Sequence, residues 1–416
     1  MSGKTELRLF DDPLPQLVVE AASFVDITPT TSLIDESSKI DFVIYGSERE
    51  YLDLNDTFLY VRYSVKAADG KTTLPTDSKV VPARYMMNAL FSDVTLALND
   101  TVIEGGNQLY SYKSTIETIF GFNREAKEVK FTALGFDNDP EVRKKWIASS
   151  KQAELAGPLR LDFFNQPKYL LPNVNVRVTL TRSKTDFSLA GGGSTAAKLT
   201  IHDVKLYVRR VRVAKPVVMA HEKGLTLRNA VYHYQRGKVV SYSISQGALS
   251  HNRDNIFSTA LLPKFVIVGF VKATSFNGDS QDDDPFFFEH FNVQSVGLYR
   301  DGQSVPYREV YQPSFTKGIV VKEYVKSIIH NTQLMNTNQN NGITLSDFIS
   351  NGYTFFTFNL TADFDYNQQQ IAHDGNLRLD IKFEKSLAQP INVIVYGLFD
   401  TLINITKDRQ IITANV

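Results

Sequence analysis

Apolar residues recur at every second position along most of the chain. In residues 377–384, Leu, Leu, Ile and Phe alternate with charged side chains, and the same alternation occurs in 94–98, 174–180, 204–208 and 391–395. Successive side chains of a β-strand point to opposite faces of a sheet, so this pattern predicts half-buried strands. The 28 Phe and 19 Tyr suit such pleated surfaces. We therefore expect a mainly antiparallel β fold.

Two stretches have the three- and four-residue spacing of helices instead. Their apolar residues are Leu109, Tyr112, Ile116, Ile119 and Phe120 in the first, and Val321, Tyr324, Val325, Ile328 and Ile329 in the second. Residues 140–156, rich in Glu, Lys and Ala, are a weaker helical candidate and indicate a surface insertion. Turns are predicted at three Asp-Gly pairs, Asp69-Gly70, Asp301-Gly302 and Asp374-Gly375.

The two halves of the chain follow a similar order of elements. Residues 91–100 and 291–300 have related patterns, in which Leu96 matches Val296 and Leu98 matches Leu298. After each helix come further alternating segments, 159–164, 174–182 and 199–213 in one half and 354–360, 377–384 and 391–405 in the other. A chance similarity between strands is the alternative. The shared order favours a duplicated antiparallel sandwich of ~200 residues per copy, joined near Lys215-Pro216.

Composition narrows the function classes. The chain has 416 residues, long enough for two domains, and its 43% hydrophobic and 22% charged residues exclude wholesale disorder. Lys+Arg and Asp+Glu are both 45, so no net charge attracts nucleic acid or membrane from a distance. The absence of Cys excludes disulfides and thiolate metal sites. We predict no signal peptide and no transmembrane segment, because the densest apolar run, 265–271, is too short.

Candidate chemical motifs each have a simpler explanation. Gly70-Lys71-Thr72 resembles the end of a phosphate-binding loop, but Val65 occupies the position of the required Gly, which favours a hairpin turn. The run 282–284 with Asp279 offers oxygen ligands for calcium, yet it lacks the spacing of a calcium loop, and a solvated loop is favoured. The seven histidines have no metal-ligand spacing: His202, His221, His233, His251, His290, His330 and His373.

A basic strand, residues 205–212, is the best nucleic-acid candidate, because Arg and Tyr side chains meet phosphates and bases. The alternative, which we favour, is that these side chains are solvated or paired with acids. No Gly-x-Ser-x-Gly motif is present. The sequence therefore predicts no catalytic, cofactor-binding or metal-ligating residue, and no cofactor.

A family resemblance is carried by many segments in order. Residues 40–61, Ile-Asp-Phe-Val-Ile-Tyr-Gly-Ser-Glu-Arg-Glu-Tyr-Leu-Asp-Leu-Asn-Asp-Thr-Phe-Leu-Tyr-Val, resemble the opening of the capsid (hexon) protein of Polinton or Maverick elements and adintoviruses. Further matching segments are 91–99, 110–118, 161–165, 168–173, 256–269, 284–291, 301–306 and 395–400 with Arg409. The resemblance spans about residues 30 to 412 and fails at the loops 137–157, 187–197 and 331–342.

The resemblance implies a major capsid protein with an all-β fold of two tandem eight-stranded antiparallel jelly-roll sandwiches, a double jelly roll, with a short helix in each. The implied division is an N-terminal arm (1–29), a first jelly roll (30–214) and a second jelly roll (215–416). Such a subunit is not an enzyme. Three chains are expected to form a pseudo-hexagonal capsomer of an icosahedral shell.

The implied partners are two further copies of the chain, neighbouring capsomers and a single jelly-roll penton protein, with a packaging ATPase and a maturation protease in the same system. The shell would enclose double-stranded DNA without sequence-specific binding. The protein would be made in the host cytoplasm or nucleus and reside in the virion capsid. The polar loops 137–157 and 331–342 are expected to face outward.

An alternative function belongs to another class. Tandem jelly rolls also occur in carbohydrate-binding and glycan-processing proteins, in which paired carboxylates, or Tyr and Trp side chains, line a cleft. The single Trp146 lies in the charged segment 141–146, where anchoring a loop is an equally simple role. The sequence singles out no carboxylate pair.

Overall fold

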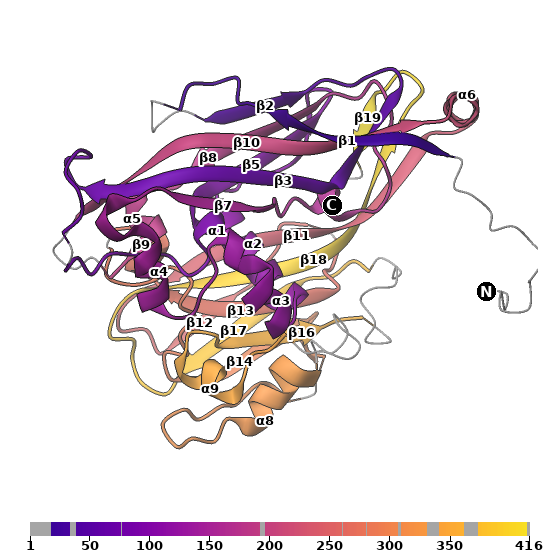
Figure 1. Ribbon diagram of the computed structural model, residues 1–416. Helices are drawn as coiled ribbons and strands as arrows, with labels where there is room; N and C mark the ends of the chain where they lie inside the picture. The colour runs from indigo at the N-terminus through magenta and orange to yellow at the C-terminus, as the bar shows by residue number, and fades with distance from the viewer. Residues whose placement is uncertain are drawn as a thin grey trace, which may run out of the picture.

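The chain folds into two antiparallel β-sandwiches, one beside the other (Figure 1). The computed structural model describes residues 18–33, 39–75, 77–191, 196–259, 261–279, 281–306, 309–330, 341–361 and 373–413. In these residues the first sandwich consists of two four-stranded sheets, and the second of a five-stranded and a four-stranded sheet.

The first sandwich has the strand order of a jelly roll. Its strands are β1 (Val19–Ile27), β2 (Ile40–Ile44), β3 (Glu50–Ala67), β5 (Phe91–Leu98), β6 (Thr101–Glu104), β7 (Ala153–Pro158), β8 (Val176–Arg182) and β10 (Ala197–Val213). One sheet has the order β1-β10-β3-β7 and the other β2-β8-β5-β6. A small separate pair joins β4 (Val81–Pro82) to β9 (Leu189–Ala190).

The second sandwich repeats this order strand for strand. Its strands are β11 (Ala230–Ile244), β12 (Ser250–Arg253), β13 (Phe265–Lys272), β14 (Val293–Arg300), β15 (Gln303–Val305), β16 (Phe355–Asn359), β17 (Leu377–Phe383) and β18 (Ile391–Ile405). The sheets are β11-β18-β13-β16, with β19 (Ile411–Thr413) beside β18, and β12-β17-β14-β15. The predicted fold of two eight-stranded sandwiches is therefore confirmed for the described residues.

Both predicted helices are present. The first is α2 (Tyr110–Gly121), and the second is α8 (Val321–Tyr324), continued by the π-helix η4 (Val325–His330). The other helical elements are α1 (Met86–Ala89), α3 (Arg124–Val129), η1 (Phe131–Leu134), α4 (Pro140–Ile147), η2 (Ala148–Ser150), η3 (Asp162–Asn165), α5 (Thr185–Ser188), α6 (Lys215–Leu225), α7 (Ala273–Asn277) and α9 (Leu345–Ser350). Most of them lie in connections between strands.

Each sandwich core is formed by the alternating apolar positions. On β17, Leu377, Leu379, Ile381 and Phe383 are buried, while the residues between them are partly or fully exposed. Burying one such side chain stabilises the fold by about 1.5–3 kcal/mol relative to leaving it in water. The period-two pattern thus determines which face of each strand is inside.

The structure confirms the internal repeat in detail. Leu96 pairs with Val178 on β8, and the matching Val296 pairs with Ile381 on β17. The hairpins that follow also correspond. Asn99 and Asp100 (φ 43° and 66°) connect β5 to β6, whereas the predicted Asp301-Gly302 turn (φ 49° and 85°) connects β14 to β15. Two successive positive φ angles are typical of the tight turns that join antiparallel strands.

Two predicted elements near the middle of the first half are wrong. Residues 159–164 are not a strand, because η3 begins at Asp162, whose N–H donates to Glu104. The helical candidate 140–156 ends at Ile147, and residues 153–158 form β7 beside β3. The helix ends where Ala148 adopts an extended ψ of 135°, and the positive φ angles of Ser149 and Ser150 follow it. The segment is also more than a surface insertion, since Ile147 is buried.

Further expectations about boundaries and turns need correction. The predicted N-terminal arm contains β1, which pairs with β10, so residues 19–27 belong to the first sandwich. The Asp374-Gly375 hairpin turn is wrong, because Asp374 forms an antiparallel bridge with Leu261. Near the predicted joint, α6 connects β10 to β11. Of the loops 187–197 and 331–342, residues 192–195 and 331–340 lie outside the described residues.

Candidate functional site: the seam between the two jelly rolls

Helix α2 lies between the two sandwiches, in the contact zone that we call the seam (Figure 1). It contacts β5 of the first sandwich and β11 and β18 of the second. Polar side chains of α2 are therefore buried together with its apolar ones, including Ser111, Lys113, Ser114, Thr115 and Thr118. A helix covered on all sides in this way positions charged groups where water does not reach them.

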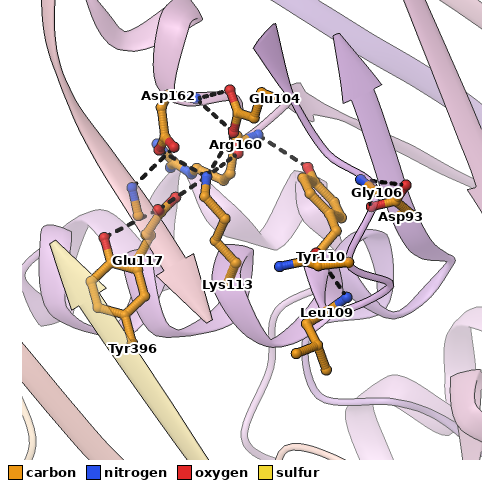
Figure 2. A network of polar contacts seen from close by, with 12 residues as sticks. Asp93, Glu104, Gly106, Leu109, Tyr110, Lys113, Glu117, Arg160, Asp162 and Tyr396 are labelled. Carbon is orange, nitrogen blue, oxygen red and sulfur yellow. Dashed lines mark hydrogen bonds and ion pairs between the residues drawn. The ribbon is translucent and has the colours of Figure 1, made fainter. Parts of the chain in front are cut away.

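One buried ammonium group is surrounded by three carboxylates at the centre of the seam (Figure 2). Lys113 Nζ lies 3.1 Å from Glu104, 3.2 Å from Glu117 and 2.8 Å from Asp162. It also donates to the Arg160 carbonyl at 3.0 Å. We call Glu104, Lys113, Glu117 and Asp162 the Lys113 cluster.

Backbone and hydroxyl groups of the second jelly roll complete the Lys113 cluster (Figure 2). The Gly237 N–H on β11 donates to Asp162 Oδ2 at 3.0 Å. The Tyr396 hydroxyl on β18 donates to Glu117 Oε1 at 3.2 Å. Because its charged atoms come from one jelly roll and these donors from the other, the cluster joins the two sandwiches.

Burial and attraction act in opposite directions on the charges of this cluster. Burial alone would lower the pKa of Lys113, but attraction by Asp162, Glu104 and Glu117 outweighs it and raises that pKa well above its usual value. Burial raises the pKa of Glu117 and, together with the charge of Glu104, that of Asp162. The ammonium is therefore retained, and the carboxyl groups of Glu117 and Asp162 hold protons more tightly than they would in water.

A second cluster, the Asp284 cluster (Arg84, Arg143 and Asp284), has the opposite composition. The Asp284 carboxylate accepts from the Arg84 backbone N–H at 2.8 Å and from Arg143 Nη1 at 3.2 Å. Arg84 Nη1 donates to the Asn351 carbonyl at 3.0 Å, and its guanidinium lies 5.0 Å from the centre of the Tyr353 ring. The expectation that this acidic run is a solvated loop is therefore wrong for Asp284, which links the two halves.

A third cluster forms around Arg409, one of the residues that carry the family resemblance. Its Nε donates to the Pro172 carbonyl at 2.9 Å, and its guanidinium pairs with Glu222 of α6. The Asn99 side chain donates to the Arg409 carbonyl at 2.9 Å. Arg84 precedes β5 and Asn99 follows it, so the Asp284 and Arg409 clusters lie at opposite ends of the seam.

Lys127 on α3 is a further buried cation of the seam. Its Nζ donates to the Ile119 carbonyl at 2.5 Å and, across the two halves, to the Asn341 carbonyl at 2.7 Å. Burial lowers the pKa of Lys127 to about 7. This cation is held by carbonyl groups, in contrast to the carboxylates around Lys113.

The sequence motifs considered for chemistry have structural roles. The Asp69 carboxylate accepts from the Lys71 and Thr72 N–H groups, both at 2.8 Å, so residues 70–72 form the predicted turn. Among the described residues, no three His, Cys, Asp or Glu side chains are placed to hold a metal ion. In the acidic run, Asp283 pairs with Lys272 at 2.9 Å.

The basic strand β10 has its cations paired with acids. Arg209 lies 3.0 Å from Asp53 and 2.6 Å from Asp56, both on β3. Lys205 lies 3.2 Å from Asp26 on β1. The acid-paired interpretation is thus confirmed for these side chains, and the nucleic-acid interpretation loses its basis there.

The seam clusters were not predicted from the sequence. Glu104, Lys113 and Asp162 come from β6, α2 and η3, so only the fold brings them together. One local signal was present, because Lys113 and Glu117 have the i, i+4 spacing of a helical ion pair. Trp146, weighed as a carbohydrate contact or loop anchor, is half-buried on α4.

Comparisons with known proteins extend over nearly the whole chain. No family model matches it. The uncharacterized protein F54H12.2 of Caenorhabditis elegans is 23% identical over 393 residues, which cover 90% of this chain and 93% of that protein. Within the described residues, no helix is both long and apolar enough to span a membrane.

Several solved viral structures have a similar fold. The Sputnik virophage structure matches with a TM-score of 0.65 and 10% identity, over 100% of this chain and 92% of that one. PBCV-1 VP54 matches with a TM-score of 0.63 and 12% identity, over 98% of this chain and 99% of that one. The mavirus major capsid protein matches with a TM-score of 0.53 and 9% identity, over 98% of this chain and 93% of that one. Together with the repeated strand order, these matches show that the chain has a double jelly-roll fold.

Proposed function

We propose that this chain is a major capsid protein, three copies of which form a pseudo-hexagonal capsomer of an icosahedral shell around double-stranded DNA. The observation that carries the proposal is the full-length match of two equivalent jelly rolls to viral capsid proteins. A trimer of such chains presents six similar sandwiches around its axis, which gives a threefold assembly a nearly hexagonal outline. In this role the protein is structural and not an enzyme.

The seam supports this role because it joins the two jelly rolls into one body. A shell subunit must keep the angle between its sandwiches constant for neighbouring capsomers to meet edge to edge. Buried charge pairs and cross-seam hydrogen bonds restrain that angle at several separate places. The paired charges on β10 also agree with a shell that encloses DNA without reading its sequence.

The more specific origin is part of the proposal. The resemblance over residues 30–412 supports a Polinton, Maverick or adintovirus capsid protein, with a penton protein and neighbouring capsomers as partners and the virion as its location. The division at 214/215 into two jelly rolls is proposed likewise. A jelly roll that begins at β1 fits the pairing of β1 with β10.

The outward direction of the two long loops is also proposed. The segments between β6 and β7 and between β15 and β16 are equivalent connections of the two jelly rolls. They meet, since the Tyr353 hydroxyl donates to Asn138 Oδ1 at 2.7 Å and Lys127 bonds to Asn341. Protease cleavage of intact trimers within 137–157 and 331–342 supports this orientation, and full protection of both contradicts it.

The assembly proposal is tested by light scattering after size-exclusion chromatography, with negative-stain images of the same fraction. We expect a particle of three times the chain mass of 46.9 kDa, with a pseudo-hexagonal outline, or closed shells. A monomer whose mass does not change with concentration contradicts the proposal. Assays of glycan hydrolysis and binding then become the next experiment.

A further inference from the structure

The seam is a contact between two different surfaces. The first jelly roll contributes α2 and η3, and the second contributes the sheet that contains β11 and β18. Since the two jelly rolls have the same strand order, each surface has a counterpart in the other jelly roll. Helix α8 with η4 lies, like α2, between the sixth and seventh strands, and the sheet of β1, β10 and β3 corresponds to that of β11, β18 and β13. These two counterparts lie at opposite ends of the molecule (Figure 1).

The helical counterpart carries exposed apolar side chains. Each helical segment contains a tyrosine, which is followed directly by Lys113 in α2 and by Val325 where α8 meets η4. Lys113 is 6% exposed because the second jelly roll covers it, whereas Val325 is 39% exposed. Val321 on α8 and Ile319 just before it are 55% and 66% exposed. We call Ile319, Val321 and Val325 the α8 patch.

The sheet counterpart carries exposed aromatic side chains. In the second jelly roll, Tyr396 of β18 pairs in register with Ile267 of β13, and both are buried on the face that α2 contacts. In the first jelly roll, Tyr207 of β10 pairs in register with Phe58 of β3, and both are partly exposed. Their rings stack 4.7 Å apart, and the ring of Phe24 on β1, 54% exposed, lies 5.9 Å from that of Phe58. We call Phe24, Phe58 and Tyr207 the aromatic patch.

Exposed apolar patches on both counterparts indicate a contact with another protein chain, since grouped apolar side chains on a surface commonly mark an interface. The two patches of one chain lie at opposite ends of the molecule and do not meet (Figure 1). A second copy brings its α8 patch to the aromatic patch of the first, as α2 meets the second jelly roll in the seam. A contact between unlike surfaces, repeated head to tail, closes into a ring when its rotation divides a full turn.

We propose, on the basis of the trimeric capsomer proposed above, that the α8 patch of one chain packs on the aromatic patch of the next chain. The partner is a second copy of this chain, and the contact repeats between chains the arrangement that the seam has within a chain. Val325 takes the place of Lys113, so the contact between chains is apolar where the seam is ionic. Three seams and three such contacts then alternate around the threefold axis.

The test is chemical cross-linking of the full-length chain, which contains no Cys, so that introduced thiols are the only ones present. The double variant Phe24→Cys/Val325→Cys is treated with a short bismaleimide, which joins two thiols only when they lie close together. We expect bands of two and three linked chains on a denaturing gel. Each single variant should stay unlinked, because the contact joins unlike surfaces. Linkage by either single variant alone contradicts the proposal.

A matched control uses Leu249, which is 57% exposed and lies on the second jelly roll. Leu249→Cys/Val325→Cys should give no linked chains, because the proposal places Val325 against the first jelly roll of the next chain. Equal linkage in this control contradicts the assignment. Light scattering of the same samples separates the two proposals. Trimers without cross-links overturn the contact alone, whereas monomers at every concentration overturn the capsomer as well.

A charge placed in the α8 patch gives a second measurement. Val325→Glu should raise the concentration at which half of the trimers dissociate at least tenfold, because the carboxylate would be buried against the aromatic patch without a partner. Leu249→Glu, at a comparably exposed position, should leave that concentration unchanged. An unchanged value for Val325→Glu, or an equal rise for both variants, contradicts the proposal.

Discussion

The Lys113 and Asp284 clusters lie on the same seam but have inverse compositions. In one, a single ammonium lies among three carboxylates; in the other, a single carboxylate lies between two arginines. Each cluster therefore has one central ion that neutralises an excess of the opposite sign. The comparison indicates that removing the central ion should destabilise each cluster most, whichever sign of charge that ion carries.

The position of each cluster determines how much its central ion contributes to the free energy of unfolding. Lys113 is buried in α2 between both sandwiches, and its four contacts come from charged groups and a carbonyl. Asp284 lies at one end of the seam and also accepts from the backbone N–H groups of Arg84 and Phe286. Loss of Lys113 leaves three buried carboxylates without a counterion, whereas loss of Asp284 leaves two arginines that retain carbonyl partners.

The largest effect is expected for Lys113→Met. The substitution keeps the volume but removes the only ammonium bonded to the three carboxylates in the described structure, so the free energy of unfolding should fall by about 3–5 kcal/mol. Urea unfolding followed by circular dichroism measures it. The control Lys205→Met removes a surface ion pair and should lower the free energy of unfolding far less than Lys113→Met does. Equal effects of the two would show that the Lys113 cluster contributes no more than a surface pair.

Asp284→Ala should rank second, with a loss of about 2–3 kcal/mol, because Arg143 and two backbone N–H groups lose their acceptor. Limited proteolysis should show faster cleavage near residues 277–285, where the two halves separate first. Asp283→Ala changes the neighbouring residue of the same acidic run, which pairs with Lys272 instead, and is the matched control. If Asp283→Ala is the more damaging change, the assignment of Asp284 as the central ion is wrong.

Lys127 sharpens the comparison because it is a buried cation held by carbonyl groups. Its pKa is about 7 in the folded protein and near 10.5 when unfolded, so between these values the unfolded chain binds more protons. The free energy of unfolding should therefore rise with pH from 7 upward, by at most about 1.4 kcal/mol per pH unit, while below pH 7 the full cost of the buried charge is present.

Lys127→Met should remove this dependence. The measurement is the difference in unfolding free energy between wild type and variant at pH 7, 8 and 9, which cancels contributions from other groups. We expect the variant to be the more stable protein at pH 7 and its advantage to shrink as pH rises. A difference that does not change with pH contradicts the assignment of a lowered pKa to Lys127.

The smallest change is expected for Glu117→Gln. This residue belongs to the excess of carboxylates around Lys113, so neutralising it removes repulsion as well as attraction. The amide oxygen still accepts from the Tyr396 hydroxyl. The free energy of unfolding should change by less than about 1 kcal/mol in either direction. A loss as large as that of Lys113→Met would mean that the cluster has no single central ion.

The strands were predictable because their signal is local. The alternation of apolar and polar residues from Leu377 to Phe383 predicts directly which face of that strand is buried. The β7 strand was missed because its composition favours a helix and only its pairing with β3 makes it a strand. The seam was missed for a related reason. A lysine four residues before a glutamate looks the same in the sequence whether the pair is buried or exposed, and Lys113 is buried only because the second sandwich covers it.

The placement of the Asp284 and Arg409 clusters at opposite ends of the seam has a mechanical consequence. Bending the two sandwiches apart at one end separates them most at that end and least at the centre of the seam. Each terminal cluster therefore resists the bending at the greatest distance from that centre. β5, which separates them, spans about 26 Å at ~3.3 Å per residue. Pressure on one face of the molecule is therefore carried by both sandwiches together, as it would be by a single stiff plate.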